Sequence, residues 1–122
     1  MYIEFIDCVN NYIKNNKDFT IAIDENGKLD NPKYGYIISI TPLINIGMDT
    51  NQIIEYVFFN RCIKINGRNH KLYIGGWFDK GKLNIDISVI SKSKNDAIQI
   101  GNYCNQKAIY DLDKKEIINI KN

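Results

Sequence analysis

The stretch YIGGWFDKGKLNIDIS, residues 73–88, contains the residue types best suited to hold a ligand. Lys80-Gly81 lies between two alternating runs, which is the pattern of a two-residue β-hairpin. In this register Trp77 faces Asn84, and Gly75 faces Asp86. Side chains alternate along a strand, so we expect a core face and an opposite face. The core face carries Ile74, Phe78, Leu83, Ile85 and Ile87, and the opposite face carries Tyr73, Gly75, Trp77, Asn84, Asp86 and Ser88.

The opposite face places the only tryptophan beside a position that has no side chain. Glycine inside a strand weakens the strand by about 0.5–1 kcal/mol, and the close approach of a ligand or another backbone is one use for it. A base or sugar stacked on Trp77 and held by Asn84 and Asp86 fits this surface. The alternative interpretation is structural: the indole packs under a helix or loop, and the glycine pair forms a bulge.

Catalytic motifs are scarce in the sequence. His70 is the only imidazole and lies in a polar turn beside Arg68. Asp86 and Asp111 are a possible carboxylate pair on neighbouring strands, although Asp111 can equally cap the following turn. No nucleophile motif of a hydrolase or transferase is present. We therefore predict no catalytic residues and no enzyme activity, with a minor enzyme role for Asp86 and His70 as an alternative.

The three cysteines, Cys8, Cys62 and Cys104, are far apart and form no C-x-x-C pair. A structural zinc site requires four clustered ligands, so we expect reduced thiols, no metal and no cofactor. The net charge of +2 is too small to indicate duplex nucleic acid as a partner.

The two arginines are the candidates for contacts with an anionic ligand, since the guanidinium group pairs well with phosphate. Arg61 ends the second predicted helix, and Arg68 lies in the turn before the hairpin; solvated surface cations are the alternative. Asn105 lies at the end of the third predicted helix, where C-terminal capping is an alternative to ligand contact.

The pattern of elements predicts an α+β fold with a mainly antiparallel sheet and about three helices. Helices are expected at 2–14, at 49–60 with an Asp49–Gln52 capping box, and at 93–104. Strands are expected at 19–24, 36–43, 73–79, 82–88, 108–112 and 117–120, with Pro42 ending the second of them. The order is therefore α-β-β-α-β-β-α-β-β, in one domain covering residues 1–122. A signal peptide and a membrane-spanning run are not evident, which favours a cytoplasmic protein with no membrane partner.

Several strings resemble a pattern found in small phage and prophage proteins. They are Gly75-Gly76-Trp77, then Ile85-Asp86-Ile87-Ser88, then Ala97 and Gly101 in a helix, and finally Asn105, Gln106 and Ala108 to Asp111. A looser match covers residues 35–42 and the second helix, so the resemblance spans most of the chain. Within this pattern the sequence is most similar to the first family of Thoeris anti-defence proteins.

The resemblance implies a protein of the infected bacterial cytoplasm that binds a cyclic ADP-ribose isomer without cleaving it. Such a protein keeps this TIR-derived signal from its effector. The resemblance also implies a homo-oligomer with at least two subunits, and cyclic oligonucleotides as a second class of ligand that the family can bind. A sponge must outcompete the effector, and a site shared by two protomers encloses a ligand more deeply than one sheet does.

The expected ligand contacts combine stacking, phosphate pairing and polar groups. Trp77 or Phe78 would stack on the ligand, Phe78 only if Gly75 and Gly76 form a bulge. Arg61 and Arg68 would pair with phosphate, and Asn84, Asp86 and Asn105 would supply polar contacts. The alternative function is a protein-binding inhibitor of a host defence complex that uses Trp77 and Tyr73 as a contact patch.

Overall fold

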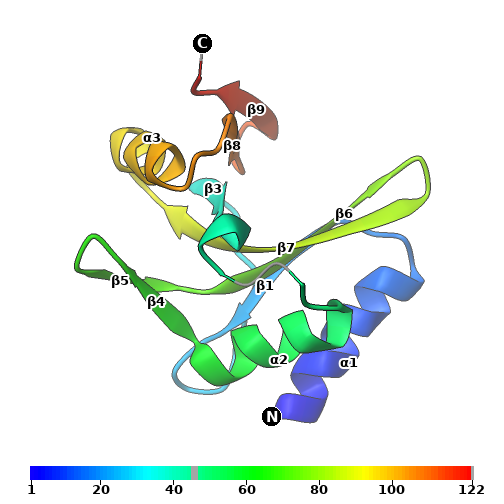
Figure 1. Ribbon diagram of the computed structural model, residues 1–122. Coiled ribbons are helices and arrows are strands. Elements are labelled where there is room, and N and C mark those ends of the chain that lie inside the picture. Colours follow the sequence, from blue (N-terminus) through cyan, green and yellow to red (C-terminus); the bar gives the residue numbers. More distant parts are fainter. Residues whose placement is uncertain (45–46, 122) are drawn as a thin grey trace.

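The computed structural model describes residues 1–44 and 47–121 (Figure 1). The helices are α1 (Tyr2–Lys14), α2 (Thr50–Asn60) and α3 (Lys94–Tyr103), with a 3-10 helix at Thr41–Leu43. The strands are β1 (Phe19–Ile23), β2 (Leu29–Asp30), β3 (Tyr36–Ser39), β4 (Cys62–Ile65), β5 (Arg68–Lys71), β6 (Tyr73–Asp79), β7 (Lys82–Ser91), β8 (Ala108–Asp111) and β9 (Glu116–Asn119). The predicted α+β fold is confirmed, and the three predicted helices and the predicted strands occur in the predicted order.

Two features of the fold differ from the sequence prediction. Arg68 and His70, expected to lie in a turn, belong to a separate β4–β5 hairpin, and the segment between β1 and β3 contains the short strand β2, which was not predicted. The strand expected at 36–43 ends at Ser39 and continues as the 3-10 helix that contains Pro42. Proline has no N–H to donate to a ladder, so the early end of this strand has a local cause.

The main sheet has the strand order β2-β1-β6-β7-β3-β8-β9, and its neighbouring strands pair antiparallel. Strand β3 lies between β7 and β8 although it comes much earlier in the chain. This long-range insertion brings the C-terminal β8–β9 hairpin onto the same sheet as β6 and β7.

The three helices cover one face of this sheet. Ile74 on β6, Ile87 on β7 and Ile38 on β3 are fully or almost fully buried in the same core cluster as residues from the three helices. The helix contribution to that cluster is Phe5, Val9, Ile53, Ile54, Val57, Phe58, Ala97 and Ile100. In Figure 1, α1 and α2 lie below the sheet and α3 lies at its upper left, and no helix lies in the angle between the β6–β7 hairpin and β8–β9.

Short-range signals position the helices as expected. Asp49 accepts a hydrogen bond from the Gln52 N–H, and the Gln52 side chain accepts one from the Asp49 N–H, both at 2.9 Å. This capping box begins α2 and is confirmed. Asn16 after α1 and Asn105 after α3 have left-handed φ values of 53° and 58°. Asparagine tolerates this conformation, so both residues end their helices locally.

The β6–β7 hairpin has the predicted register. Trp77 pairs with Asn84, Gly75 with Asp86 and Asp79 with Lys82. Lys80 and Gly81 have φ values of 52° and 79°, as a two-residue turn with both central residues in the left-handed region requires. The pairing is continuous through Gly75 and Gly76, so the interpretation of this pair as a bulge is wrong.

Position 76 requires glycine because the Phe19 ring occupies the space that a side chain would need. Phe19 on β1 lies directly opposite Gly76, and a Cβ at Gly76 would come within 2.3 Å of that ring. We expect Gly76→Ala to destabilise the fold by about 1–3 kcal/mol, the usual cost of overpacking. Urea denaturation measures this cost.

The double variant isolates the cause of that loss. In a Phe19→Ala background, where the ring is absent, Gly76→Ala is expected to cost less than about 0.5 kcal/mol. An equal cost in the two backgrounds would show that the ring is not the reason for the glycine.

Candidate ligand-binding groove

The face of the sheet that the helices leave uncovered is hollowed into a groove of about 760 Å³. Ligand sites commonly have volumes of about 300–1,000 Å³, so the size suits a small molecule. We call this hollow the sheet groove. It is lined by residues of β1, β3, β6, β7, β8 and β9 and of the segments next to them: Asp18, Phe19, Thr20, Asn31, Pro32, Ile37, Ser39, Gly75, Gly76, Trp77, Asp86, Ser88, Ala108, Ile109, Tyr110, Leu112, Lys115 and Ile117.

Trp77 lies on the wall formed by β6 and is 45% exposed. The indole is therefore accessible from solvent, and the alternative in which it packs under a helix or loop is wrong. Ile117 on β9 lines the same groove and is 70% exposed. An aromatic ring and an aliphatic side chain thus supply apolar surface from distant parts of the chain.

The floor of the sheet groove carries a carboxyl group in the space above a glycine. A Cβ built at Gly75 would lie 2.7 Å from Asp86 Oδ1, which is closer than real Cβ atoms come to other atoms. We expected a ligand or another backbone to approach this glycine, whereas the Asp86 side chain of the paired strand occupies the space. Any other residue at position 75 would displace the carboxyl group.

Burial raises the pKa of Asp86 to about 6, and a hydrogen bond with Ser39 offsets only part of this rise. Desolvation disfavours the charged form of a carboxyl group, and no cation is among the causes of the shift. Near neutral pH most Asp86 side chains are ionised, so the groove floor carries a negative charge that is only partly stabilised by the protein.

Ser88 adds a second costly group to the floor. It is 0% exposed, and its Oγ is buried without a hydrogen-bond partner among the described residues. An unsatisfied buried hydroxyl costs roughly 1–3 kcal/mol. Ser39 lies directly opposite Ser88 in the β3–β7 register, so the side chains of Ser39, Asp86 and Ser88 leave the same face of two adjacent strands.

Charged groups at the rim are few and of both signs. Asp18 and Lys115 line the sheet groove together with Asp86. Asp18 Oδ1 accepts a hydrogen bond from the Phe78 N–H at 2.9 Å, which ties the start of β1 to β6. The groove is therefore not a basic site, and a strongly anionic ligand has only the Lys115 ammonium group as a cationic partner among the lining residues.

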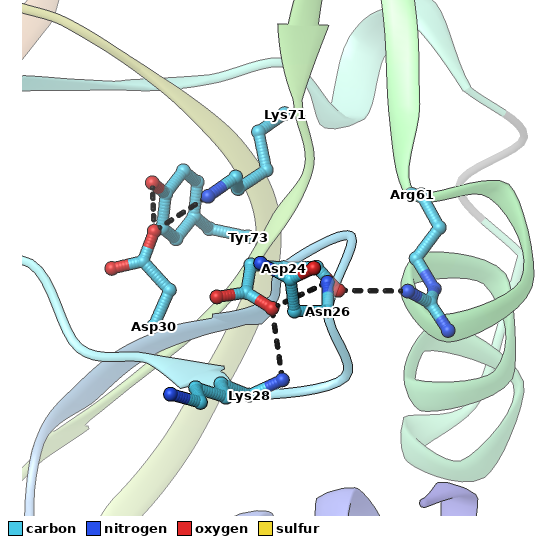
Figure 2. A network of polar contacts seen from close by, with 7 residues as sticks. All are labelled: Asp24, Asn26, Lys28, Asp30, Arg61, Lys71 and Tyr73. Carbon is cyan, nitrogen blue, oxygen red and sulfur yellow. Dashed lines mark hydrogen bonds and ion pairs between the residues drawn. The ribbon is translucent and has the colours of Figure 1, made fainter.

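Arg61 lies away from the sheet groove and stabilises the end of α2. Its Nε donates to the Phe58 carbonyl at 2.6 Å, and Nη1 donates to the Asp24 carbonyl at 3.1 Å. The guanidinium carbon also lies 4.7 Å from the centre of the Phe58 ring. Figure 2 shows Arg61 directed at the main chain of the β1–β2 loop, where Asp24 in turn accepts from the Asn26 and Lys28 N–H groups at 2.9 Å.

Arg68 and Asn105 are likewise outside the groove lining. Arg68 is on β5, with its side chain 78% exposed and 3.9 Å from an Asp96 carboxylate oxygen in the first turn of α3. Asn105 is exposed, and its side chain accepts a hydrogen bond from Lys121. The predicted C-terminal cap accounts for Asn105, and the structure brings neither arginine to Trp77.

The remaining predicted contacts lie on opposite faces of the β6–β7 hairpin. Asn84 is half-buried on the same face as Trp77, and its Nδ2 donates to the Lys82 carbonyl at 3.4 Å. Phe78 is on the helix-covered face because the glycine pair forms no bulge. Of the predicted site residues, the groove lining therefore contains Trp77 and Asp86, with Asn84 adjacent.

Tyr73 is buried, so the predicted exposed patch of Trp77 and Tyr73 does not form. Its hydroxyl donates to Asp30 Oδ2 at 2.8 Å, and Lys71 Nζ contacts the same oxygen at 2.8 Å (Figure 2). Burial raises the pKa of Asp30, but the bonds from Lys71 and Tyr73 outweigh burial and lower it overall. This cluster fastens β2 to the sheet.

The residues considered for catalysis are not brought together. Asp111 is the buried last residue of β8, and its Oδ1 accepts hydrogen bonds from the Asp113 and Lys114 N–H groups of the following turn at 3.0 and 3.1 Å. His70 is on β5, is not in the groove lining, and has a pKa lowered mainly by burial and then by Arg68. The described residues contain no cluster of His, Cys, Asp and Glu suited to a metal ion.

No protein-family model, curated protein or solved structure matches the chain. Within residues 1–44 and 47–121, no helix combines the length and hydropathy needed to cross a membrane. The fold and the groove together define an α+β domain with a ligand-sized hollow on the uncovered face of its sheet.

The contacts of Arg61 predict a structural role for this residue. Arg61→Ala is expected to lower the free energy of unfolding by about 1–3 kcal/mol, because two hydrogen bonds and a ring contact are lost. The matched control is Arg68→Ala, whose exposed side chain is expected to matter by less than about 0.5 kcal/mol. Thermal and urea denaturation measure both variants, and an equal loss of stability in Arg61→Ala and Arg68→Ala would contradict this assignment.

The environment of Asp86 predicts a stability change with pH. Because the folded pKa of about 6 lies above the ordinary value of 3.8, this group favours folding below pH 3.8 and loses that contribution as the pH rises through 6. The loss is up to about 3 kcal/mol, and Asp86→Asn is expected to remove it.

Urea denaturation near the two ends of this pH range measures the difference between Asp86→Asn and the parent protein. We expect Asp86→Asn to gain stability over the parent as the pH rises, and the exposed-site control Asp79→Asn to show no such gain. If Asp86→Asn and the parent differ in stability by the same amount at both pH values, the Asp86 carboxyl group is not desolvated in the folded protein.

Proposed function

We propose that the protein binds a nucleotide-derived signal in the sheet groove and sequesters it without cleaving it. The ligand that we propose is a cyclic ADP-ribose isomer made by a TIR-domain enzyme, as expected of a phage-type anti-defence protein in an infected bacterium. The observation that carries the proposal is the pairing of an accessible indole with a polar floor: Trp77 is 45% exposed, and Asp86 and Ser88 line the same groove.

Trp77 would stack on the adenine of this ligand. Stacking of a base on an aromatic side chain contributes roughly 1–3 kcal/mol and needs only an accessible ring face. The phosphates would lie toward solvent at the groove rim near Lys115, since Asp86 repels them from the floor. This orientation differs from the phosphate pairing by Arg61 and Arg68 that the sequence suggested.

A second copy of the chain would complete the site. Sequestration at nanomolar concentration requires about −12 kcal/mol of binding free energy. An open groove encloses a ligand on one side, whereas ligand sites commonly bury most of the ligand surface. A homo-oligomer that closes the sheet groove with a partner surface supplies the missing enclosure, and cyclic oligonucleotides are a further ligand class that such an assembly could hold.

Calorimetric titration with the cyclic ADP-ribose isomer tests the proposal. We expect Trp77→Ala to weaken binding by about ten- to a hundredfold, and heat denaturation of the complex to release the ligand with unchanged mass. Tyr103→Ala is the control, because this aromatic ring is 57% exposed but is outside the groove lining. A hydrolysed ligand, or no binding at micromolar protein, would refute the proposal.

The second candidate is a protein-binding inhibitor of a host defence complex. It is favoured by the exposure of Trp77 and Ile117 on the two sides of the groove, 45% and 70% respectively. Exposed apolar side chains that gather on one face are typical of protein contacts. Capture of a defence protein that is lost in Trp77→Ala, without any effect of nucleotide ligands on thermal stability, would favour this candidate.

A further inference from the structure

Two polar groups on the groove floor, the Ser88 hydroxyl and the Asp86 carboxyl group, have fewer hydrogen-bond partners among the described residues than they can bind. Ser88 is 0% exposed, and its Oγ has no hydrogen-bond partner among the described residues. Within the described part of the chain, the one side-chain partner of Asp86 is the Ser39 hydroxyl, which also lies 3.5 Å from Thr41 Oγ1. An ionised carboxylate offers about four acceptor positions, so most of its capacity is unused by side chains. Both groups lower the stability of the ligand-free protein, and both residues line the sheet groove.

The strand geometry directs these groups to one place. Asp86 and Ser88 are two residues apart on β7, so their side chains leave the same face of the sheet. Ser39 lies opposite Ser88, and Gly75 lies opposite Asp86. Because Gly75 has no side chain, the carboxyl group lies low on the sheet and leaves the space above it open to a ligand.

The hydrogen-bonding groups of the groove floor determine which ligand group fits there. Ionised Asp86 accepts hydrogen bonds only, and Ser88 can both accept and donate. A phosphate offers mainly acceptors and carries negative charge, so it does not fit beside Asp86 and Asp18. A vicinal diol offers two adjacent donors, which matches the two oxygens of a carboxylate.

We propose that Asp86, Ser39 and Ser88 form a ribose subsite, in which the 2′- and 3′-hydroxyls of a ligand ribose donate to the Asp86 carboxylate and Ser88 Oγ bonds one of the same hydroxyls. This inference rests on the proposed function, since it assumes a nucleotide-class ligand in the sheet groove. Trp77 and Gly75 are two residues apart on one strand face, roughly 7 Å. That separation is comparable to the span from a nucleobase to its ribose hydroxyls, so one nucleoside reaches both groups.

The subsite has a pH dependence of defined sign. The diol donates best to ionised Asp86, whose pKa is about 6 in the free protein because of burial. Binding is therefore expected to weaken several-fold as the pH falls from about 7.5 to about 5. The other titratable groups that line the groove are Asp18, Tyr110 and Lys115.

The probes are adenosine and 2′,3′-dideoxyadenosine, titrated into the full chain while the Trp77 fluorescence is recorded. We expect adenosine to bind at least tenfold more tightly than the dideoxynucleoside. Asp86→Asn is expected to remove that preference, and the control Asp79→Asn, in the same hairpin but outside the groove lining, is expected to retain it. Ser88→Ala is expected to weaken adenosine binding about three- to tenfold while the melting temperature stays unchanged or rises, because no bond within the protein is lost.

The outcomes separate this inference from the proposed function. Equal binding of the two nucleosides, with binding still weakened by Trp77→Ala, overturns the ribose subsite and leaves the nucleotide site in place. A preference for adenosine that survives in Asp86→Asn also overturns it. If neither nucleoside binds at millimolar concentration, the ribose subsite is overturned, and the proposed function is decided separately by the titration with the cyclic ADP-ribose isomer.

Discussion

The placement of the Asp86 carboxyl group above Gly75 is the constraint on which the sheet groove depends. The carboxyl oxygen occupies the position that a side chain at residue 75 would need, 2.7 Å from a Cβ built there. This arrangement exists only in the register that pairs the two residues. A slip of β7 by one residue against β6 would transfer the side chains of β7 to the other face, burying Asp86 and exposing Ile87. The apolar packing of the helix-covered face therefore also fixes the polar groups of the uncovered face.

The two faces of the sheet have opposite energetic roles. The covered face buries Ile38, Ile74 and Ile87 against the helices and supplies the stability that burial of apolar surface provides. The uncovered face holds a desolvated carboxyl group and an unsatisfied hydroxyl, which both reduce stability in the ligand-free protein. Such costs are typical of functional sites, where binding groups are arranged before the ligand arrives. The groove is thus supported by a core that does not contribute to its chemistry.

Local sequence signals were sufficient to predict the hairpin and the helix ends. Lys80-Gly81 and the alternation around it determine the register that places Trp77 and Asp86 together, and Asp49 with Gln52 determines where α2 begins. The β4–β5 hairpin was missed because β5, with the sequence RNHK, contains no apolar residue, although Asn66-Gly67 is a hairpin turn sequence. Strand β2 has two residues, which is too short for any periodicity to be recognised.

Long-range topology was the part of the site that sequence reasoning could not reach. Lys115 and Ile117 line the groove only because β3 inserts between β7 and β8, and no local pattern encodes that order. The role of Arg61 depends on the Asp24 carbonyl, 37 residues earlier in the chain. Whether Ser88 finds a hydrogen-bond partner depends on the residues that pack around it in the fold. The sequence near Ser88 therefore cannot predict that its hydroxyl lacks one among the described residues.

The most direct test of the central claim is a ¹³C NMR titration of the Asp86 carboxyl carbon in the full chain, with and without adenosine. A carboxyl group desolvated above Gly75 should titrate with a midpoint near 6, and donor hydroxyls from adenosine should lower that midpoint by stabilising the charged form. A midpoint near the ordinary value of 3.8, unchanged by the nucleoside, would mean that the carboxyl group is solvated and that the groove floor is not a binding site.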